Sequence, residues 1–495
     1  MIPFGQYAPD QPAYANTGGA TVAKNVLPRA KGSYTPMSSL AVVTDALTAR
    51  CQGAFGARDQ DGNVKTFAGD ATKLYELSAS SWSDVSSTTY SLGTEEAWEF
   101  TQYGERVIAV GTSQAPQTYL MGSDSAFSNL GGSPPTGRHV GVIGNFVFIG
   151  NLTNAPADVQ WCAIDNPTDW PTIGTADAAQ KQSDKQTLPE GGWVQSIVGA
   201  VGQVDGMIFM DTSIYRVQYE GSPTVFGFYK VENARGTPCP NAVVSNGTEA
   251  FYISEDGFYR TNGTASAPIG AQRVDKWFWG EVDQSYLYRV YGAADPINKL
   301  VFWVYPENGT ATGNPSRYIA YHWNLDEWSH GEIDCEMIFR DLTQGYNLDN
   351  ADGLGYTVDT APFGPDSRAW TGGRLILSAF DTDNKLARFT GSALAATIET
   401  GEVGGNELIG DPKQRVYLSG VRPYVDGGTV TVGLKYRDTT QASLTTDGPN
   451  SVDADGMAHF SRSARYFRMQ INIAAGGTWT HAQGIDVDAV GDGAL

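Results

Sequence analysis

The chain has 495 residues, a formal net charge of −21 at neutral pH, an apolar fraction of 41% and 58 glycines. This length exceeds what one ordinary hydrophobic core supports, so we expect a large domain and a smaller one. The apolar content excludes a disordered chain, and the excess of carboxylates argues against a Lys/Arg groove that grips phosphates. An acidic wall past which DNA slides stays compatible with this charge, as does plain solvation of the surface.

The four cysteines are far apart in the sequence and form no CxxC pair. This spacing favours folding in a reducing cytosol, where cysteines serve as small apolar residues. The first residues contain neither a basic run nor an apolar core, so we expect no signal peptide. No run of about 18 apolar residues occurs, so we expect no membrane span. The cysteines are Cys51, Cys162, Cys239 and Cys335.

Residues 1–50 are poor in alternating apolar positions and rich in proline, glycine and alanine. We expect an extended arm that lies on the next domain or on a neighbouring subunit. A short strand is predicted around residues 22–27, ending at Pro28. The apolar anchors of the arm are Ile2, Phe4, Tyr7 and Tyr14.

One plan recurs between residues 51 and 391: an apolar strand, a polar or glycine turn, and a strand that carries aromatic residues. Residues 250–262 show it most clearly, because Phe251, Ile253 and Phe258 alternate with other side chains around a Glu-Asp-Gly turn. Alternation of period two predicts half-buried strands, and the glycine permits the turn. One such hairpin buries too little apolar surface to stay folded alone. The copies begin near Val64, Val107, Phe146, Met207, Ala250, Leu300 and Leu375.

These copies, roughly 40 to 75 residues apart, predict a β-propeller, because blades recur about every 40–50 residues. Radial packing of the blades would protect the edges of the sheets. We expect about seven blades, with six or eight left open, and insertions at 151–192 and 341–373. A loop or short helix is expected at 175–190, on one rim, and a short amphipathic helix at 271–288.

From about residue 392 the strands become longer and are separated by glycine-rich and acidic turns. Residues 392–495 therefore predict a small β-sandwich, or strands that close the ring and then cap it. The expected fold class is all-β, with an N-terminal arm over 1–50, a propeller over 51–391 and a C-terminal β domain over 392–495.

No motif in the sequence predicts catalysis or a cofactor. HExxH, P-loop and GxSxG patterns are absent, as is a GxGxxG between a strand and a helix. The five histidines lack metal-ligand spacing, so surface histidines are favoured over a zinc site at His322 and His330. Paired carboxylates stay open among 54 Asp and Glu residues. We expect no catalytic, cofactor-binding or metal-binding residue.

Turn chemistry explains the other candidate motifs. Residues 59–63 and 381–384 resemble pieces of calcium loops but lack the glutamate that completes one. The turn at Ser254 misses by one residue the register of the turn motif found in propeller glycosidases. Three Asn-Gly-Thr tripeptides match the glycosylation sequon, yet hairpin turns favour Asn-Gly at the same places. They begin at Asn246, Asn262 and Asn308.

Several stretches carry a resemblance to known proteins, densest between about residues 200 and 280. They are residues 1–10, 23–28, 51–55, 166–170, 219–228, 236–244, 254–260 and 268–278. In these stretches the chain resembles a family of bacteriophage and prophage structural proteins, β-propellers that form the tail nozzle or tail hub of short-tailed phages.

The resemblance implies a non-enzymatic virion protein. Family members assemble as a homo-oligomeric ring, commonly a hexamer, around the DNA channel below the portal and adaptor. The implied partners are the adaptor or connector ring, tail fibre or spike proteins, and genomic DNA that passes without sequence-specific binding. The implied location is the virion tail, after assembly in the bacterial cytoplasm. Two alternatives stay open: a propeller enzyme that degrades glycans, such as a tail depolymerase, and a host propeller scaffold.

Overall fold

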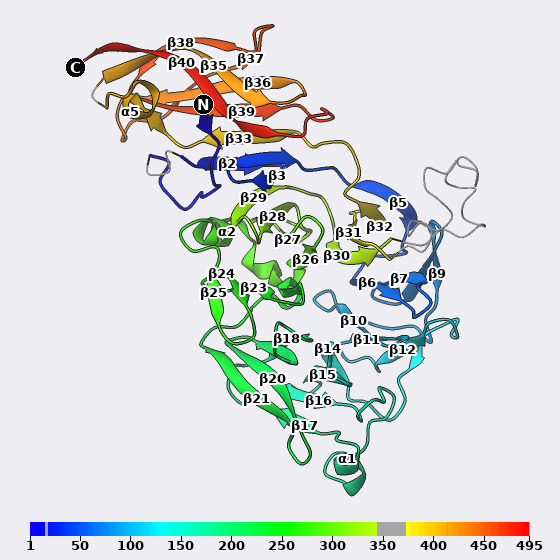
Figure 1. Cartoon of the computed structure of the whole chain (residues 1–495). Helices are drawn as coiled ribbons and strands as arrows, with labels where there is room; N and C mark the ends of the chain where they lie inside the picture. The colour runs from blue at the N-terminus through cyan, green and yellow to red at the C-terminus, as the bar shows by residue number, and fades with distance from the viewer. Residues whose placement is uncertain (15–17, 344–372, 413, 495) are drawn as a thin grey trace.

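The computed structural model describes residues 1–14, 18–343, 373–412 and 414–494. Strands dominate these residues and build two bodies, a propeller of seven blades and a β-sandwich above it (Figure 1). The predicted all-β propeller fold is thereby confirmed. Among the residues described, no helix has the length and apolar character needed to cross a membrane.

The first five blades follow one another along the chain, and each is an antiparallel sheet whose strand order is the chain order. Short turns suffice for this connectivity. The strands of blades one and two are β6 (Gly53–Arg58), β7 (Val64–Gly69), β8 (Leu74–Ser78), β9 (Ser81–Asp84), β10 (Trp98–Tyr103), β11 (Arg106–Gly111), β12 (Gln117–Leu120) and β13 (Ser128–Asn129). Those of blades three to five are β14 (Gly137–Ile143), β15 (Phe146–Leu152), β16 (Ala155–Trp161), β17 (Lys185–Thr187), β18 (Val194–Val198), β19 (Gly206–Met210), β20 (Ser213–Gly221), β21 (Val225–Asn233), β22 (Val244–Ser245), β23 (Ala250–Ser254), β24 (Gly257–Thr261) and β25 (Ser266–Pro268).

The central strands of a blade are buried on both faces, because each blade packs against the next. Strand β15 shows this, since all seven of its residues are buried. Its Phe148 stacks on Trp161, with ring centroids 5.2 Å apart, and Trp161 meets Phe226 of the next blade edge-on at 5.3 Å. Strands that are buried on both faces have continuous runs of apolar residues. The central hairpins of the blades are therefore the repeats that are visible in the sequence.

A strand from near the N-terminus closes the ring. The seventh blade takes three strands from the end of the propeller sequence, and β5 pairs antiparallel with β32 as the fourth. The amide of Leu386 donates to Thr44 Oγ1 at 3.0 Å across this pair. Closure joins two segments more than 300 residues apart in the chain. The strands of blades six and seven are β26 (Tyr291–Asp295), β27 (Leu300–Tyr305), β28 (Arg317–His322), β29 (Glu327–Glu332), β30 (Met337–Leu342), β31 (Leu375–Phe380), β32 (Lys385–Arg388) and β5 (Ala41–Ala46).

The sandwich is built from both ends of the chain. One sheet has the order β3-β4-β40-β35-β38, with β1 added to β40; the other has the order β2-β33-β39-β36-β37, with β34 added to β39. The strands are β1 (Ile2–Pro3), β2 (Ala20–Lys24), β3 (Val26–Ala30), β4 (Ser33–Pro36), β33 (Ala396–Thr400), β34 (Val403–Gly404), β35 (Gln414–Val425), β36 (Val430–Arg437), β37 (Thr445–Ser451), β38 (Ala458–Ala464), β39 (Tyr466–Ile473) and β40 (Ala482–Ala494).

The described part of residues 1–46 is therefore not the extended surface arm expected from the sequence. It supplies β1–β4 to the sandwich and β5 to the last blade. Its anchors Phe4 and Tyr7 are buried in the core shared by the sandwich and blade six. The physical reason is that these short strands gain their hydrogen bonds from residues far along the chain, which local alternation does not reveal.

Sandwich and propeller share one sheet at their junction. Strand β2 runs parallel to β29 of blade six, with Lys24 opposite His330. The ring of Tyr7 stacks on His330, with centroids 4.9 Å apart, and Trp277 meets His330 edge-on at 5.0 Å. This junction makes the two bodies one continuous packed unit.

Within the residues that the structure describes, the helices are few and short. The loop or helix expected at 175–190 contains α1 (Ala176–Gln180), and the helix expected at 271–288 is α2 (Asp275–Glu281), followed by the 3₁₀ helix η2 (Gln284–Arg289). The others are η1 (Pro240–Ala242) and α5 (Gly405–Ile409). Most of the insertion expected at 341–373 lies outside the described residues. All four cysteines are buried and free.

Candidate functional site

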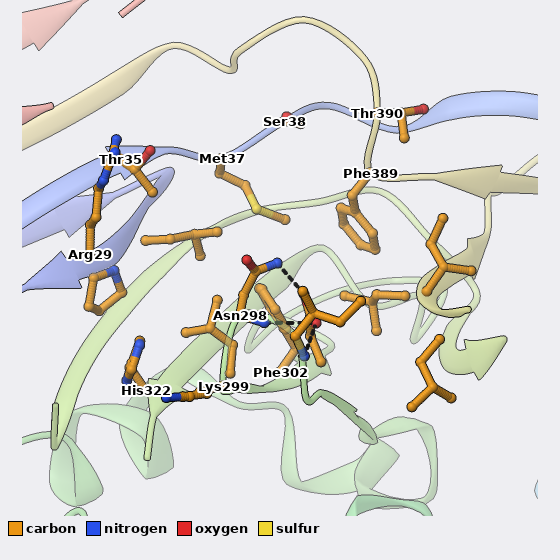
Figure 2. Close-up of a pocket in the computed structure, with 18 of the residues that line it drawn as sticks. Arg29, Thr35, Met37, Ser38, Asn298, Lys299, Phe302, His322, Phe389 and Thr390 are labelled. Carbon is orange, nitrogen blue, oxygen red and sulfur yellow. Dashed lines mark hydrogen bonds between the residues drawn. The ribbon is translucent and has the colours of Figure 1, made fainter. Parts of the chain in front are cut away.

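A cleft of about 820 Å³ lies between the sandwich and the propeller (Figure 2). Its walls are β3, β4 and the segment after them on one side, and blades six and seven on the other. The volume falls within the range of protein sites for small molecules or short peptide segments, about 300–1,000 Å³.

The floor of the cleft is apolar. Met37 and Phe389 point into it in Figure 2, from the segments that follow β4 and β32. The Phe389 ring stacks on Phe302 of β27, with ring centroids 6.2 Å apart. Leu377 of β31 completes this surface. An occupant therefore gains affinity by burying an apolar side chain here.

Exposed cations surround the apolar floor. They are Arg29 of β3, Lys299 in the turn between β26 and β27, and Arg374 directly before β31. Arg29 donates through Nη1 to the carbonyl of Thr480 at 2.7 Å, and none of the three takes part in an ion pair with another described residue. Among the described residues of the lining there is one carboxylate, Asp295, and it accepts hydrogen bonds from the amides of the following turn. The cleft is thus positively charged in a strongly acidic chain.

His322 adds a neutral donor to the lining. Its Nδ1 accepts the amide hydrogen of Leu325 at 3.1 Å, so the ring proton belongs on Nε2. Burial lowers the pKa of His322, and the charge of Lys299 lowers it further. The imidazole is therefore neutral at pH 7 and offers an N–H to an acceptor.

His330, the second histidine considered as a zinc ligand, lies in the junction and packs against Tyr7 and Trp277. Within the part of the chain that the structure describes, no group of three or more His, Cys, Asp or Glu side chains is placed to share a metal ion. The calcium-like and sequon positions form turns. Asp59 accepts from the amide and side chain of Asn63, and Asn246 accepts from the amide of Thr248, as Asx turns do.

A much smaller space lies within the propeller, where the first strands of several blades come together. It measures about 30 Å³ and is lined by residues on or beside the innermost strands of blades two to five. Two carboxylates, Glu95 and Glu99, reach it, and Glu99 pairs with His139 Nδ1 at 2.7 Å. About one water molecule fits such a space.

Comparison with known proteins adds little to these observations. Neither a protein-family model nor a curated protein matches the sequence. Among solved structures, the chain is similar to the WD40 domain of Pan2 from Neurospora crassa, with 8% identity, a TM-score of 0.36, and coverage of 78% of this chain and 93% of that one. It is also similar to a quinonprotein alcohol dehydrogenase-like protein from Bacteroides thetaiotaomicron, with 12% identity, a TM-score of 0.35, and coverage of 56% and 66%. A third is the computationally designed Ika8 protein, with 7% identity, a TM-score of 0.33, and coverage of 70% and 98%.

Sequence reasoning missed the cleft. Its cations come from three segments, around residues 29, 299 and 374, that no motif connects. Taken alone, each of these cations is expected to be an ordinary solvent-exposed side chain.

Proposed function

We propose that the chain is a structural subunit of a short-tailed phage tail, a nozzle or hub protein that assembles as a ring around the DNA channel. The observation that carries the proposal is the resemblance of the sequence to that family over most of its length, densest between about residues 200 and 280. In the assembled tail, adaptor or connector subunits and fibre or spike proteins are its neighbours, and the genome passes through without sequence-specific binding.

The architecture suits this role physically. Strand β5 closes the propeller, and the sheet continuous from blade six into the sandwich fixes the two bodies together. A ring that retains a pressurised genome needs subunits that do not deform. The net charge of −21 also suits a conduit, because an acidic wall repels phosphates and keeps DNA from adhering.

Electron microscopy tests the proposal. We expect the purified full-length chain to form closed rings in negative stain, and antibodies against it to label the tails of the particles whose genome encodes it. A protein that stays monomeric and is absent from tails would refute the role.

The enzymatic alternative has its own assay. The purified chain is incubated with polysaccharide from the host surface, and newly formed reducing ends are measured. We expect none above a boiled control. Release of reducing ends would favour the depolymerase over the structural role.

A further inference from the structure

We infer that the cleft between sandwich and propeller binds the acidic segment 486–494 of a second copy of this chain. The inference rests on the ring proposed above and specifies one contact within it. It assigns a ligand of definite chemistry to the cleft: an extended peptide in which carboxylates alternate with apolar side chains.

The charge of the cleft is the first argument. Copies that each carry −21 repel one another, so association needs a local surface of opposite sign. The cleft provides it, because Arg29, Lys299 and Arg374 are exposed and lack carboxylate partners among the described residues, while Asp295 is occupied by its own turn. Charge complementarity of this kind fixes the partner and the register of a contact.

The apolar floor is the second argument. Met37, Phe302, Leu377 and Phe389 supply little to an ion that is fully hydrated. They favour an occupant that brings apolar side chains together with its carboxylates, since burial of apolar surface is stabilising by about 25 cal/mol per Å². A small inorganic anion or a bare phosphate backbone lacks that component.

The second half of β40 has this chemistry. Asp486, Asp488 and Asp492 are exposed and are interspersed with apolar residues, and Val490 is 57% exposed. Segment 486–494 therefore presents carboxylates together with an exposed apolar side chain, the combination that the cleft fits.

One edge of this half-strand is also open. Strand β35 pairs with one edge of β40 along its whole length, but on the other edge β1 and β4 reach only residues 482–485. From residue 486 onward the second edge has no strand neighbour among the described residues. An unpaired edge is a ready site for contact with another chain.

The two surfaces lie well apart on the molecule. In Figure 1 the end of β40 projects from the far side of the sandwich, away from the space between β3 and β31. A contact between two different surfaces of identical subunits is heterologous, and repetition of it generates a closed ring or a filament. The inference is therefore consistent with a ring.

Charge reversal in the cleft tests the contact. The full-length variant Lys299→Glu/Arg374→Glu is compared with wild type and with a matched control, Arg216→Glu/Lys276→Glu, by sedimentation velocity over a range of concentrations. We expect the cleft variant to assemble at least tenfold more weakly than the control, which carries the same net charge. Equal assembly of both variants would overturn the inference.

A charge swap tests the partner segment. Adding Asp486→Lys and Asp492→Lys to the cleft variant gives two lysines on the segment opposite the two introduced glutamates of the cleft, so we expect assembly to recover. Failure of the swap, in a chain whose circular dichroism matches wild type, would overturn the assignment of segment 486–494.

A cross-link provides a readout that does not depend on the charge variants. Val490→Cys combined with Asn298→Cys should give disulfide-linked oligomers on mild oxidation, and each single variant should not; absence of the link would overturn the inference.

Rings that persist unchanged in the cleft variant would overturn this contact alone and leave the proposed function standing. Absence of the wild-type protein from tails would overturn the proposed function itself.

Discussion

Replacement of His330 by glutamine should reduce the loss of stability that the protein undergoes between pH 7 and pH 5. Burial in the junction lowers the pKa of His330 to about 3, and the charges of Lys24 and Arg317 contribute in the same direction, against an opposing effect of Glu332. The folded protein therefore keeps this imidazole neutral across the whole interval.

The sign and the size follow from proton linkage. An unfolded histidine has a pKa of about 6.5, so below that pH the unfolded chain binds a proton that the folded chain refuses. The contribution of the neutral His330 to the unfolding free energy is fully present above pH 6.5 and is lost progressively as the pH falls toward 3. At pH 5 the solution is about 1.5 pH units below the pKa of the unfolded histidine, which corresponds to a loss of about 2 kcal/mol of unfolding free energy.

Urea denaturation at pH 7 and pH 5 measures this effect. Wild type and His330→Gln share every other titrating group, so the difference between their two pH effects isolates His330. A control is His459→Gln, because the His459 side chain is 71% exposed and its partner is the carboxylate of Asp453, 2.7 Å away. An identical loss of unfolding free energy in wild type and His330→Gln would refute the reasoning.

Three further substitutions test how the fold is held together, each by urea denaturation at pH 7. Glu402→Gln should lower the unfolding free energy by about 3–5 kcal/mol, because that carboxylate is fully buried and pairs with two arginines at 2.7 and 3.1 Å. Thr44→Val should cost about 1–3 kcal/mol, since it leaves the amide of Leu386 without its acceptor in the seventh blade. Gly53→Ala should cost about 1–3 kcal/mol by overpacking, because a Cβ there would lie 2.2 Å from the carbonyl oxygen of a tryptophan in the next blade, whereas Gly280→Ala meets nothing within 4 Å and should be neutral or stabilising.

Each of these predictions has an outcome that contradicts it. A Glu402→Gln protein as stable as wild type would show that the sandwich does not depend on this buried ion cluster. Unchanged stability of Thr44→Val would show that the hydrogen bond from the amide of Leu386 to Thr44 does not stabilise the seventh blade. Equal effects at Gly53 and Gly280 would show that the close approach between the first two blades is relieved at no cost.

The propeller could be predicted because its central hairpins carry their own signal. Strands such as β15 and β23 are buried on both faces, so they require apolar runs that stand out between turn residues. The outer strands gave no signal: β13 is two exposed residues, Ser128–Asn129, and an edge so short and polar reads as a turn. The sequence therefore predicts about seven blades, with six or eight left open, and only the structure shows that there are seven and where each one ends.

The sandwich was predicted only from its C-terminal half. Strand β2 pairs with β33 and β29, and β5 pairs with β32, across hundreds of residues. Short strands acquire their stability from such partners more than from intrinsic preference, so residues 1–46 looked like an arm. No local sequence pattern identifies a partner strand that lies hundreds of residues away.

By itself, the sequence determined the all-β class, the repeated blades and the acidic surface, because alternation, turn residues and charge are properties of neighbouring positions. Only the tertiary structure decided that the N-terminal strands close the ring and complete the sandwich. It alone also gathered Arg29, Lys299 and Arg374 around one apolar cleft. Contacts between distant segments depend on how packed bodies meet in space, and that information is not carried by the spacing of residues along the chain.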